Sequence, residues 1–290
     1  MCLNLCKEGF WVSIKGLQTE IKPQWCPGCT YFADLQAIYK TFLDLGFDET
    51  NLVLVGGIGC TGRITSYVDL YTIHTLHGRP LPVALGFKLA NPKMNVVVVS
   101  GDGDLLSIGG THFIHTARKN IDLTVIMFDN FVYGLTKGQV SPTSPHNLVT
   151  STTPYGNLDE PVNPISLALI SGATFVAQTF ALDINHTFQV IKEAINHKGF
   201  SFVNILSPCI TYYRSEDVKT FRNKIKQLNE QYLTDLAKAV YNSTSYEYYV
   251  GVFYKVEKPS FEGYLLKDIV PLKSELYQKE KIKKLLKNYS

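Results

Sequence analysis

The sequence predicts an α/β fold in which a mostly parallel sheet is flanked by helices. Short runs of apolar, mostly β-branched residues alternate with longer segments in which apolar residues recur with a helical period. Several of the short runs end directly in glycine, aspartate, asparagine or cysteine, as expected where parallel strands end at one edge of a sheet. The chain has 290 residues, 45% of them hydrophobic, which is enough to bury a full core.

Composition and charge limit the classes of protein to which the chain can belong. The formal net charge of +3 is too small to indicate nucleic-acid binding, and the basic stretch 279–287 fits a solvated tail. No apolar run reaches the length of a membrane span, and the N-terminus lacks an apolar core followed by a cleavage site. Six cysteines are too few for a disulfide scaffold of this length. We therefore expect a cytoplasmic protein, bound to neither membrane nor nucleic acid, with cysteines at a metal or cluster site.

The first cysteine motif follows an N-terminal arm that we expect to span residues 1–22. Cys2 and Cys6 lie in this arm without a recognisable partner spacing, so we interpret them as incidental. Cys26 and Cys29 form a C-x-x-C loop, whose short bridge can bring both thiolates to one metal or cluster. A thioredoxin-like redox pair is the alternative, although Cys26 does not follow a strand.

A glycine-rich loop follows an expected helix at 34–45 and a buried strand at 51–55. The loop, residues 56–63, contains Cys60 among several glycines, which indicates a backbone pressed against another group. His77 lies farther along in a His-Gly-Arg turn. It either faces a phosphate or carboxylate or is an ordinary turn residue, and the residues alone leave both interpretations open.

Two strand ends in the middle of the chain carry the pattern most informative about function. An apolar strand at 96–99 runs into Gly101-Asp102-Gly103-Asp104, and a second strand at 123–128 runs into Asn130. The side chains of Asp102 and Asn130 offer hard oxygen ligands suited to Mg²⁺ or Ca²⁺. The glycines allow a tight turn whose N–H groups can approach an anion ahead of a helix N-terminus. These strand ends therefore predict a diphosphate and metal site, with a pair of ordinary turns as the alternative.

The spacing of these residues resembles the fingerprint of thiamine diphosphate enzymes, in which Gly-Asp-Gly is followed at a distance by Asn. In that family a backbone carbonyl two residues after the Asn completes the protein ligands of Mg²⁺, and here it would belong to Val132. The irregular segment 131–164 starts at this site, so we expect a loop that covers a cofactor.

The fourth loop cysteine, Cys209, follows an apolar strand at 200–206 just as Cys60 follows an earlier strand. Because strand ends of a parallel sheet gather at one edge, we expect Cys60, Cys209, Asp102 and Asn130 on one rim. The remaining expected elements are helices at 82–89, 105–117, 165–171, 186–196 and 219–240, a strand at 175–177, and a strand or edge hairpin at 246–254.

Together, the motifs resemble the beta subunit of 2-oxoacid:ferredoxin oxidoreductases, and the short chain is similar to the archaeal two-subunit enzymes. The resemblance implies a thiamine diphosphate-binding domain at 23–215, followed by a C-terminal helical extension and tail at 216–290. It rests on Trp25-Cys26-Pro27-Gly28-Cys29, Gly57-Ile58-Gly59-Cys60, His77-Gly78-Arg79, Gly101-Asp102-Gly103-Asp104, Asn130, Tyr133-Gly134-Leu135-Thr136-Lys137-Gly138-Gln139 and Ser207-Pro208-Cys209.

The resemblance implies three cofactors, namely thiamine diphosphate, Mg²⁺ and one [4Fe–4S] cluster. The implied cluster ligands are Cys26, Cys29, Cys60 and Cys209. The implied magnesium ligands are Asp102, Asn130 and the carbonyl of Val132. The implied thiamine diphosphate contacts are Ile58, Gly59, Cys60, His77, Gly101, Asp102, Gly103, Asp104, Asn130, Val132, Tyr133, Gly134 and Leu135. Arg63 and Lys137 would be catalytic cations, but Arg63 stands near a family position that is often Lys, which leaves substrate preference open because the two are not interchangeable.

The resemblance also implies a reaction and its partners. A 2-oxoacid would be oxidatively decarboxylated to acyl-CoA and CO₂, with coenzyme A as the acyl acceptor and electrons passed through the cluster to ferredoxin. The family supplies a cofactor-activating glutamate from the alpha (or fused gamma-alpha) subunit, so we expect the chain to be inactive alone. One alternative is a non-redox thiamine diphosphate decarboxylase, which leaves the cysteines unexplained. The other is an iron–sulfur electron-transfer subunit without catalysis, which leaves Asn130 unexplained.

Overall fold

One eight-stranded sheet organises the computed structural model, which describes residues 16–213, 215–228, 234–244 and 248–265. The strand order is β2-β1-β3-β4-β8-β7-β10-β9. The strands are β1 (Leu52–Gly56), β2 (Tyr71–His74), β3 (Asn95–Gly101), β4 (Leu123–Asp129), β7 (Phe175–Phe180), β8 (Phe200–Leu206), β9 (Ile225–Gln227) and β10 (Tyr248–Lys255).

The sheet is mostly parallel, as the sequence predicted. Every neighbouring pair from β2 to β7 is parallel, and β10 runs antiparallel to β7. Strands β1, β4 and β8 are buried at every position. Uninterrupted apolar runs are required here because both faces of such a sheet are covered by helices.

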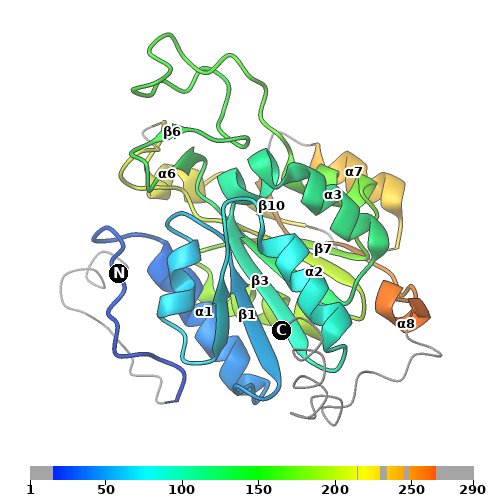
Figure 1. Cartoon of the computed structure of the whole chain (residues 1–290). Helices are drawn as coiled ribbons and strands as arrows, with labels where there is room; N and C mark the ends of the chain where they lie inside the picture. Colours follow the sequence, from blue (N-terminus) through cyan, green and yellow to red (C-terminus); the bar gives the residue numbers. More distant parts are fainter. Residues whose placement is uncertain (1–15, 214, 229–233, 245–247, 266–290) are drawn as a thin grey trace, which may run out of the picture.

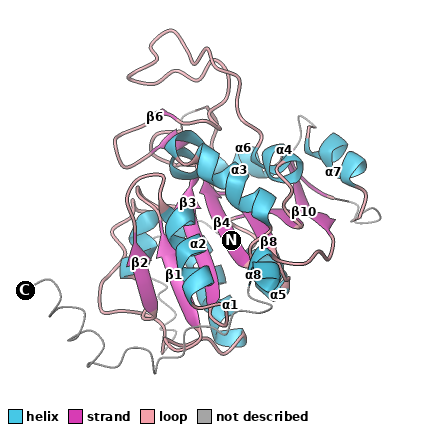
Figure 2. Ribbon diagram, turned by 45° about the vertical axis from the view of Figure 1, so that its right-hand side comes forward, coloured by secondary structure: helices cyan, strands magenta, loops and turns pink. Residues whose placement is uncertain are grey.

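Helices cover the two faces of the sheet and complete a three-layer fold (Figures 1 and 2). Successive residues of β1 show how the strands serve both layers, since Leu52 and Leu54 pack in one apolar cluster and Val53 and Val55 in the other. The helices on the first face are α1 (Tyr31–Asp44) and α5 (Ile184–Asn196). Those on the second face are α2 (Pro80–Ala90), α3 (Gly110–Lys119), α4 (Pro164–Ile170) and α7 (Leu236–Ser243).

The prediction of one helix over residues 219–240 was wrong. The segment contains α6 (Val218–Arg222), strand β9 and the start of α7, and residues 229–233 lie outside the described part of the chain. Two separate caps explain the division, because Asp217 accepts a hydrogen bond from Thr220 N and Asp235 accepts one from Lys238 N. Each aspartate satisfies backbone donors at a new helix start.

The chain after residue 215 contributes two strands to the sheet, namely β10, which agrees with the strand expected at 246–254, and β9, which was not expected. Strand β10 lies between β7 and β9, so it is not an edge strand. Strand β2 was not predicted, because this short edge strand is exposed or half-buried along its length and lacks an apolar run. In the expected N-terminal arm, Leu17 is buried and Gln18 pairs with Val68, whereas Cys2 and Cys6 lie outside the described residues.

The carboxyl edge of the sheet carries the irregular structure. A π-helical turn (Asp104–Ile108) separates β3 from α3, and π-helical turns are frequent at functional sites. Strands β5 (Val132–Tyr133) and β6 (Gln139–Val140) form a small hairpin directly after β4. The long loop 141–163 follows, and its middle part projects from the body of the molecule, as the green trace in Figure 1 shows. Among the described residues, no helix has the length and apolar character needed to cross a bilayer.

Candidate functional site

The Gly-Asp-Gly turn and Asn130 lie at the ends of neighbouring strands. Strands β3 and β4 are paired so that Gly101 stands opposite Phe128, which brings the following Asp102 and Asn130 to the same edge of the sheet. Both side chains are buried. The Asn130 side-chain oxygen accepts a hydrogen bond from Val132 N at 3.1 Å, which fixes the turn after β4.

A pocket of about 180 Å³ opens above these strand ends. All thirteen residues predicted as thiamine diphosphate contacts line it, together with Tyr31, Thr61 and Thr136, which were not among the predicted contacts. Tyr31 is buried at the base and receives a hydrogen bond from the Thr61 hydroxyl. No motif indicated Tyr31, because it reaches this pocket from the start of α1.

The Asp102 carboxylate is held by two hydroxyl groups from the loop after β6. Its Oδ2 atom accepts hydrogen bonds from Ser141 Oγ at 2.5 Å and from Thr143 Oγ1 at 2.7 Å. Burial raises the pKa of Asp102, and these hydrogen bonds oppose the rise. The pKa of Asp129 is also raised, chiefly by burial and to a smaller extent by repulsion from the nearby Asp102. Asp129 lines a different pocket, so Asp102 and Asn130 are the side chains that offer oxygen to a divalent cation here, and such a cation would compensate the charge of the buried Asp102.

Asp104 ties the His77 turn to the end of β3. Its Oδ1 atom lies 2.6 Å from His77 Nδ1 and accepts a hydrogen bond from Gly78 N, and its Oδ2 atom accepts one from Ser100 Oγ. Both carboxylate oxygens are therefore engaged within the protein. Asp104 therefore orients His77, and both residues line the pocket. Direct contact between Asp104 and the cofactor stays a prediction.

The Tyr133 ring covers the Gly-Asp-Gly turn. Its hydroxyl donates a hydrogen bond to Gly103 O at 3.1 Å, and a Cβ atom at Gly103 would lie only 2.3 Å from the ring. Glycine is therefore required at residue 103, because a side chain would displace the ring from the turn.

The four predicted cluster cysteines surround an adjoining pocket of about 210 Å³. All are free thiols; Cys26 is exposed and the other three are half-buried. Trp25 anchors the C-x-x-C loop, because its Nε1–H donates to Cys60 O at 2.7 Å. A single tryptophan thus joins the two segments that carry Cys26, Cys29 and Cys60.

The cysteine pocket and the Asp102 pocket meet at Gly134. A Cβ atom at this residue would lie 3.4 Å from Cys60 Sγ, 3.9 Å from Cys209 Sγ and 3.5 Å from Asn130 Nδ2. The Cys209 N–H also donates to Asn130 O at 3.3 Å. Cys60, Cys209 and Asn130 therefore lie together at the edge of the sheet, as expected. Because residue 134 lies between the two pockets, a large side chain there would close them.

The electrostatics of the cysteines favour a cationic group among them. Burial and the neighbouring Cys209 raise the pKa of Cys60 to about 11, although Arg63 acts in the opposite direction. Burial also raises the pKa of Cys29, with a further contribution from Asp34. These thiols would ionise only beside a compensating positive charge, such as iron or zinc supplies.

The four sulfurs could surround either a single metal ion or an iron–sulfur cluster. Within the described ranges, no three His, Cys, Asp or Glu side chains converge closely enough to hold a single metal ion. A [4Fe–4S] cluster uses four thiolates around a group of atoms, which suits four cysteines around a shared pocket.

The two predicted catalytic cations lie apart from the Gly-Asp-Gly turn. Arg63 lines the cysteine pocket, where its Nη1 donates to Gln24 O at 3.2 Å. Lys137 is exposed at the tip of the β5–β6 hairpin, and its backbone φ of +76° is unusual for a residue other than glycine. Neither residue lines the pocket around Asp102.

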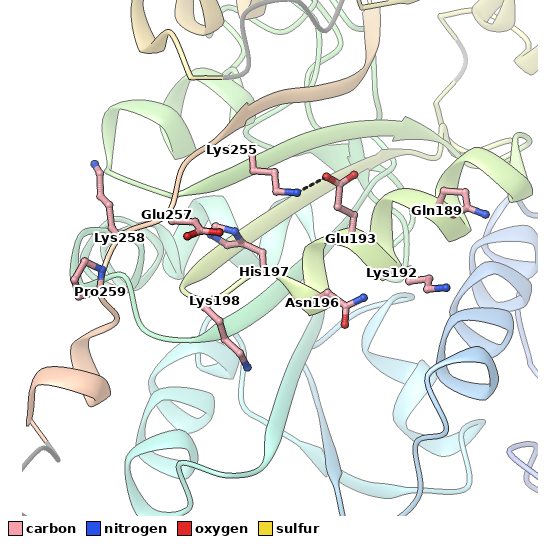
Figure 3. A pocket seen from close by; sticks show the side chains of 10 residues that line it. All are labelled: Gln189, Lys192, Glu193, Asn196, His197, Lys198, Lys255, Glu257, Lys258 and Pro259. Carbon is pink, nitrogen blue, oxygen red and sulfur yellow. Dashed lines mark hydrogen bonds and ion pairs between the residues drawn. The ribbon is translucent and has the colours of Figure 1, made fainter.

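A larger cavity of about 770 Å³ lies at the opposite end of the sheet (Figure 3). It is bounded by the C-terminal half of α5 and by the chain at the end of β10, where Lys255 stands opposite the first residue of β7. Lys255 points at Glu193 and pairs with it at 2.8 Å. None of the motif residues lines this cavity, so its size alone does not identify the functional site.

Comparison with known proteins agrees with this site. Residues 57–205 match the family "Thiamine pyrophosphate enzyme, C-terminal TPP binding domain", and this match spans both strand ends of the Asp102 pocket. The chain is 45% identical over 221 residues to subunit beta of 2-oxoacid:ferredoxin oxidoreductase 2 from Aeropyrum pernix, which covers 76% of this chain and 71% of the relative.

Two further relatives are similar over most of their length. The chain is 38% identical over 257 residues to the 2-oxoglutarate synthase subunit KorB of Methanocaldococcus jannaschii, covering 87% of this chain and 94% of the relative. The structure of 2-oxoglutarate:ferredoxin oxidoreductase from Magnetococcus marinus, with 2-oxoglutarate, coenzyme A and succinyl-CoA bound, superposes with a TM-score of 0.85. The sequences are 40% identical, and the match covers 94% of this chain and 95% of that one. With its strand-end pocket and neighbouring cysteines, the chain belongs to the family of 2-oxoacid:ferredoxin oxidoreductase beta subunits.

Proposed function

We propose that this beta subunit holds thiamine diphosphate through Mg²⁺ at Asp102, Asn130 and the Val132 carbonyl, and a [4Fe–4S] cluster at its four loop cysteines. With an alpha subunit it would convert a 2-oxoacid to acyl-CoA and CO₂ and pass the electrons to ferredoxin. The observation that carries the proposal is the shared wall between the two pockets. Tyr31, Cys60, Asn130, Gly134 and Leu135 line both, so a group in one lies beside a group in the other.

The residues of the chain have distinct parts in this proposal. Bound thiamine diphosphate would supply an electron sink for cleavage beside the 2-oxo carbon. Asp102 and Asn130 would hold the metal, and the glycines of the turn would allow the diphosphate to approach backbone N–H groups. His77 would present its Nε2 atom to the pocket, because Asp104 engages Nδ1. Arg63 and Lys137 would act on substrate or electron partner from outside the Asp102 pocket.

The partners follow from the relatives. A beta subunit acts with another chain, and we propose an alpha subunit that brings the glutamate needed to activate the cofactor. Coenzyme A and 2-oxoglutarate are bound in the Magnetococcus marinus structure. We therefore propose coenzyme A as the acyl acceptor and 2-oxoglutarate as the first 2-oxoacid to be assayed.

The test is a joint measurement of iron, sulfide and thiamine diphosphate in anaerobically purified protein co-expressed with its alpha subunit. We expect about four iron, four sulfide and one thiamine diphosphate per chain. Asp102→Ala should lose Mg²⁺-dependent thiamine diphosphate and keep iron, whereas Cys209→Ser should lose iron and the broad visible absorbance. Thiamine diphosphate without iron would favour a non-redox decarboxylase. Iron without thiamine diphosphate would favour an electron-transfer subunit.

A further inference from the structure

The carboxylate of Asp102 is bound asymmetrically by the protein. Ser141 Oγ donates to the Oδ2 atom, and Thr143 Oγ1 lies 2.7 Å from that same oxygen, so both hydroxyl groups contact Oδ2. The three side chains are buried, with exposed fractions of 2% for Asp102, 7% for Ser141 and 5% for Thr143. Water therefore competes little for these hydrogen bonds, and hydrogen bonds to a charged group in such a place are strong.

The two hydroxyl groups are themselves fixed by a compact turn. Ser144 Oγ donates to Phe131 O at 2.6 Å and accepts from Ser141 N at 2.7 Å, and Ser144 N donates to Ser141 O at 3.0 Å. Thr143 Oγ1 also lies 2.8 Å from Asp129 Oδ1. Residues 141–144 are thus braced against the end of β4, which holds the backbone that carries both hydroxyl groups beside Asp102.

This arrangement decides how Asp102 can bind a metal. A carboxylate oxygen has two lone-pair directions. The hydroxyl groups of Ser141 and Thr143 occupy both sides of Oδ2, although the single proton of Thr143 can be donated only to Asp102 or to Asp129 at one time. Oδ1 is then the oxygen available to a cation, so Asp102 can act as a one-oxygen ligand. A bidentate carboxylate, which would bring both oxygens to the ion, would require these hydrogen bonds to break.

One-oxygen and two-oxygen binding suit different ions. Mg²⁺ requires a near-ideal octahedron with short bonds, whereas Ca²⁺ takes more ligands at longer distances and often binds carboxylates through both oxygens. We propose that Ser141 and Thr143 restrict Asp102 to one-oxygen binding and thereby select Mg²⁺ over Ca²⁺ as the ion that anchors the diphosphate. This inference rests on the proposed function, in which Asp102 is a metal ligand.

The experiment measures cofactor binding rather than turnover. The complex with the alpha subunit is stripped of metal and thiamine diphosphate, and calorimetry then follows thiamine diphosphate binding during titration with Mg²⁺ or Ca²⁺. The wild-type protein should need less Mg²⁺ than Ca²⁺ for half-saturation. In the double variant Ser141→Ala/Thr143→Val, the ratio of the two half-saturating concentrations should shift toward Ca²⁺ by roughly tenfold, because hydrogen bonds to the carboxylate are lost.

Two matched variants separate this role from a general effect on the loop. Thr143→Ser keeps the hydroxyl and should keep the wild-type ratio, and Thr152→Val changes an exposed residue of the same loop and should do the same. If the double variant does not fold, the single variant Ser141→Ala should show a smaller shift in the same direction.

An unchanged ratio in a folded Ser141 or Thr143 variant would overturn the inference, as would equal weakening for both ions, which would mean that the hydroxyl groups only support the loop. Wild-type binding of thiamine diphosphate that needs no divalent cation would instead overturn the metal assignment of the proposed function itself.

Discussion

Gly57 illustrates how tightly the site is packed at the level of single residues. A Cβ atom there would lie 2.0 Å from Asp104 Oδ2 and 2.2 Å from Ser100 Oγ. These are the two atoms whose hydrogen bond fixes the end of β3. The residue after β1 therefore has to be glycine for Asp104 to reach its partners.

Replacement of Gly57 by alanine should destabilise the fold, whereas the same replacement at Gly86 should not. Gly57→Ala should lower the free energy of unfolding by about 1–3 kcal/mol through overpacking. Gly86→Ala is the control, because Gly86 lies exposed in α2 with no atom within 4 Å of a new Cβ, and it should raise stability by about 0.5–1 kcal/mol. Urea denaturation of both variants measures the difference, and similar changes for the two would contradict the packing argument.

At the level of elements, the cysteine site depends on contacts between loops rather than within them. Trp25 packs edge-on against Tyr31, Phe32 and Tyr67 and donates its indole hydrogen bond to the Cys60 loop. The ring is thus oriented by the start of α1 and by Tyr67, and its hydrogen bond joins the C-x-x-C loop to the Cys60 loop. The hydrogen bond sets the separation of the C-x-x-C loop from Cys60.

Trp25→Phe should therefore reduce iron content more than it reduces stability. The variant keeps an aromatic ring but loses one hydrogen bond, at a cost of about 0.5–1.5 kcal/mol. Tyr39→Phe is the matched control, because it removes a buried hydrogen bond to Tyr67 O, made from the middle of α1, and should leave iron unchanged. Iron and sulfide per chain, measured beside thermal unfolding, test this; equal iron in both variants would count against the bridge.

Sequence reasoning could place the strand ends because their residues carry local patterns. The apolar runs before Asp102 and Asn130 predict strands, and glycines and hard ligands follow them directly. It could not find Ser141, Thr143 or Tyr31, since serine, threonine and tyrosine are common everywhere and their contacts with the site form only in the fold. The error at 219–240 has a similar origin, because Phe221 and Ala239 share a helical spacing but pack in different apolar clusters.

At the scale of the whole molecule, the Asp102 pocket lies at the carboxyl edge of the sheet. The lining of the Asp102 pocket contains two carboxylates, and both carboxylates receive hydrogen bonds within the protein. No glutamate lines that pocket among the described residues. A partner chain that closes the edge and supplies the missing acid is therefore part of the proposed function.

Purified alone, the beta subunit should give no reduction of ferredoxin by a 2-oxoacid and coenzyme A. Addition of the alpha subunit should restore the reaction without a change in the iron content of the beta subunit. Anaerobic spectrophotometry of ferredoxin measures both states, with the Asp102→Ala complex as the inactive control. Full activity of the isolated chain would disprove the need for a partner.

The strand order has a consequence for how the protein matures in the cell. Strand β8 inserts between β4 and β7, and Cys209 follows it, so the fourth sulfur arrives beside Cys60 only when the middle of the sheet is complete. Such long-range pairing is formed late and slowly during folding. A cluster delivered to a nascent chain that ends before residue 209 would meet at most three of the four cysteines, so complete ligation of the cluster has to follow synthesis of the chain through Cys209.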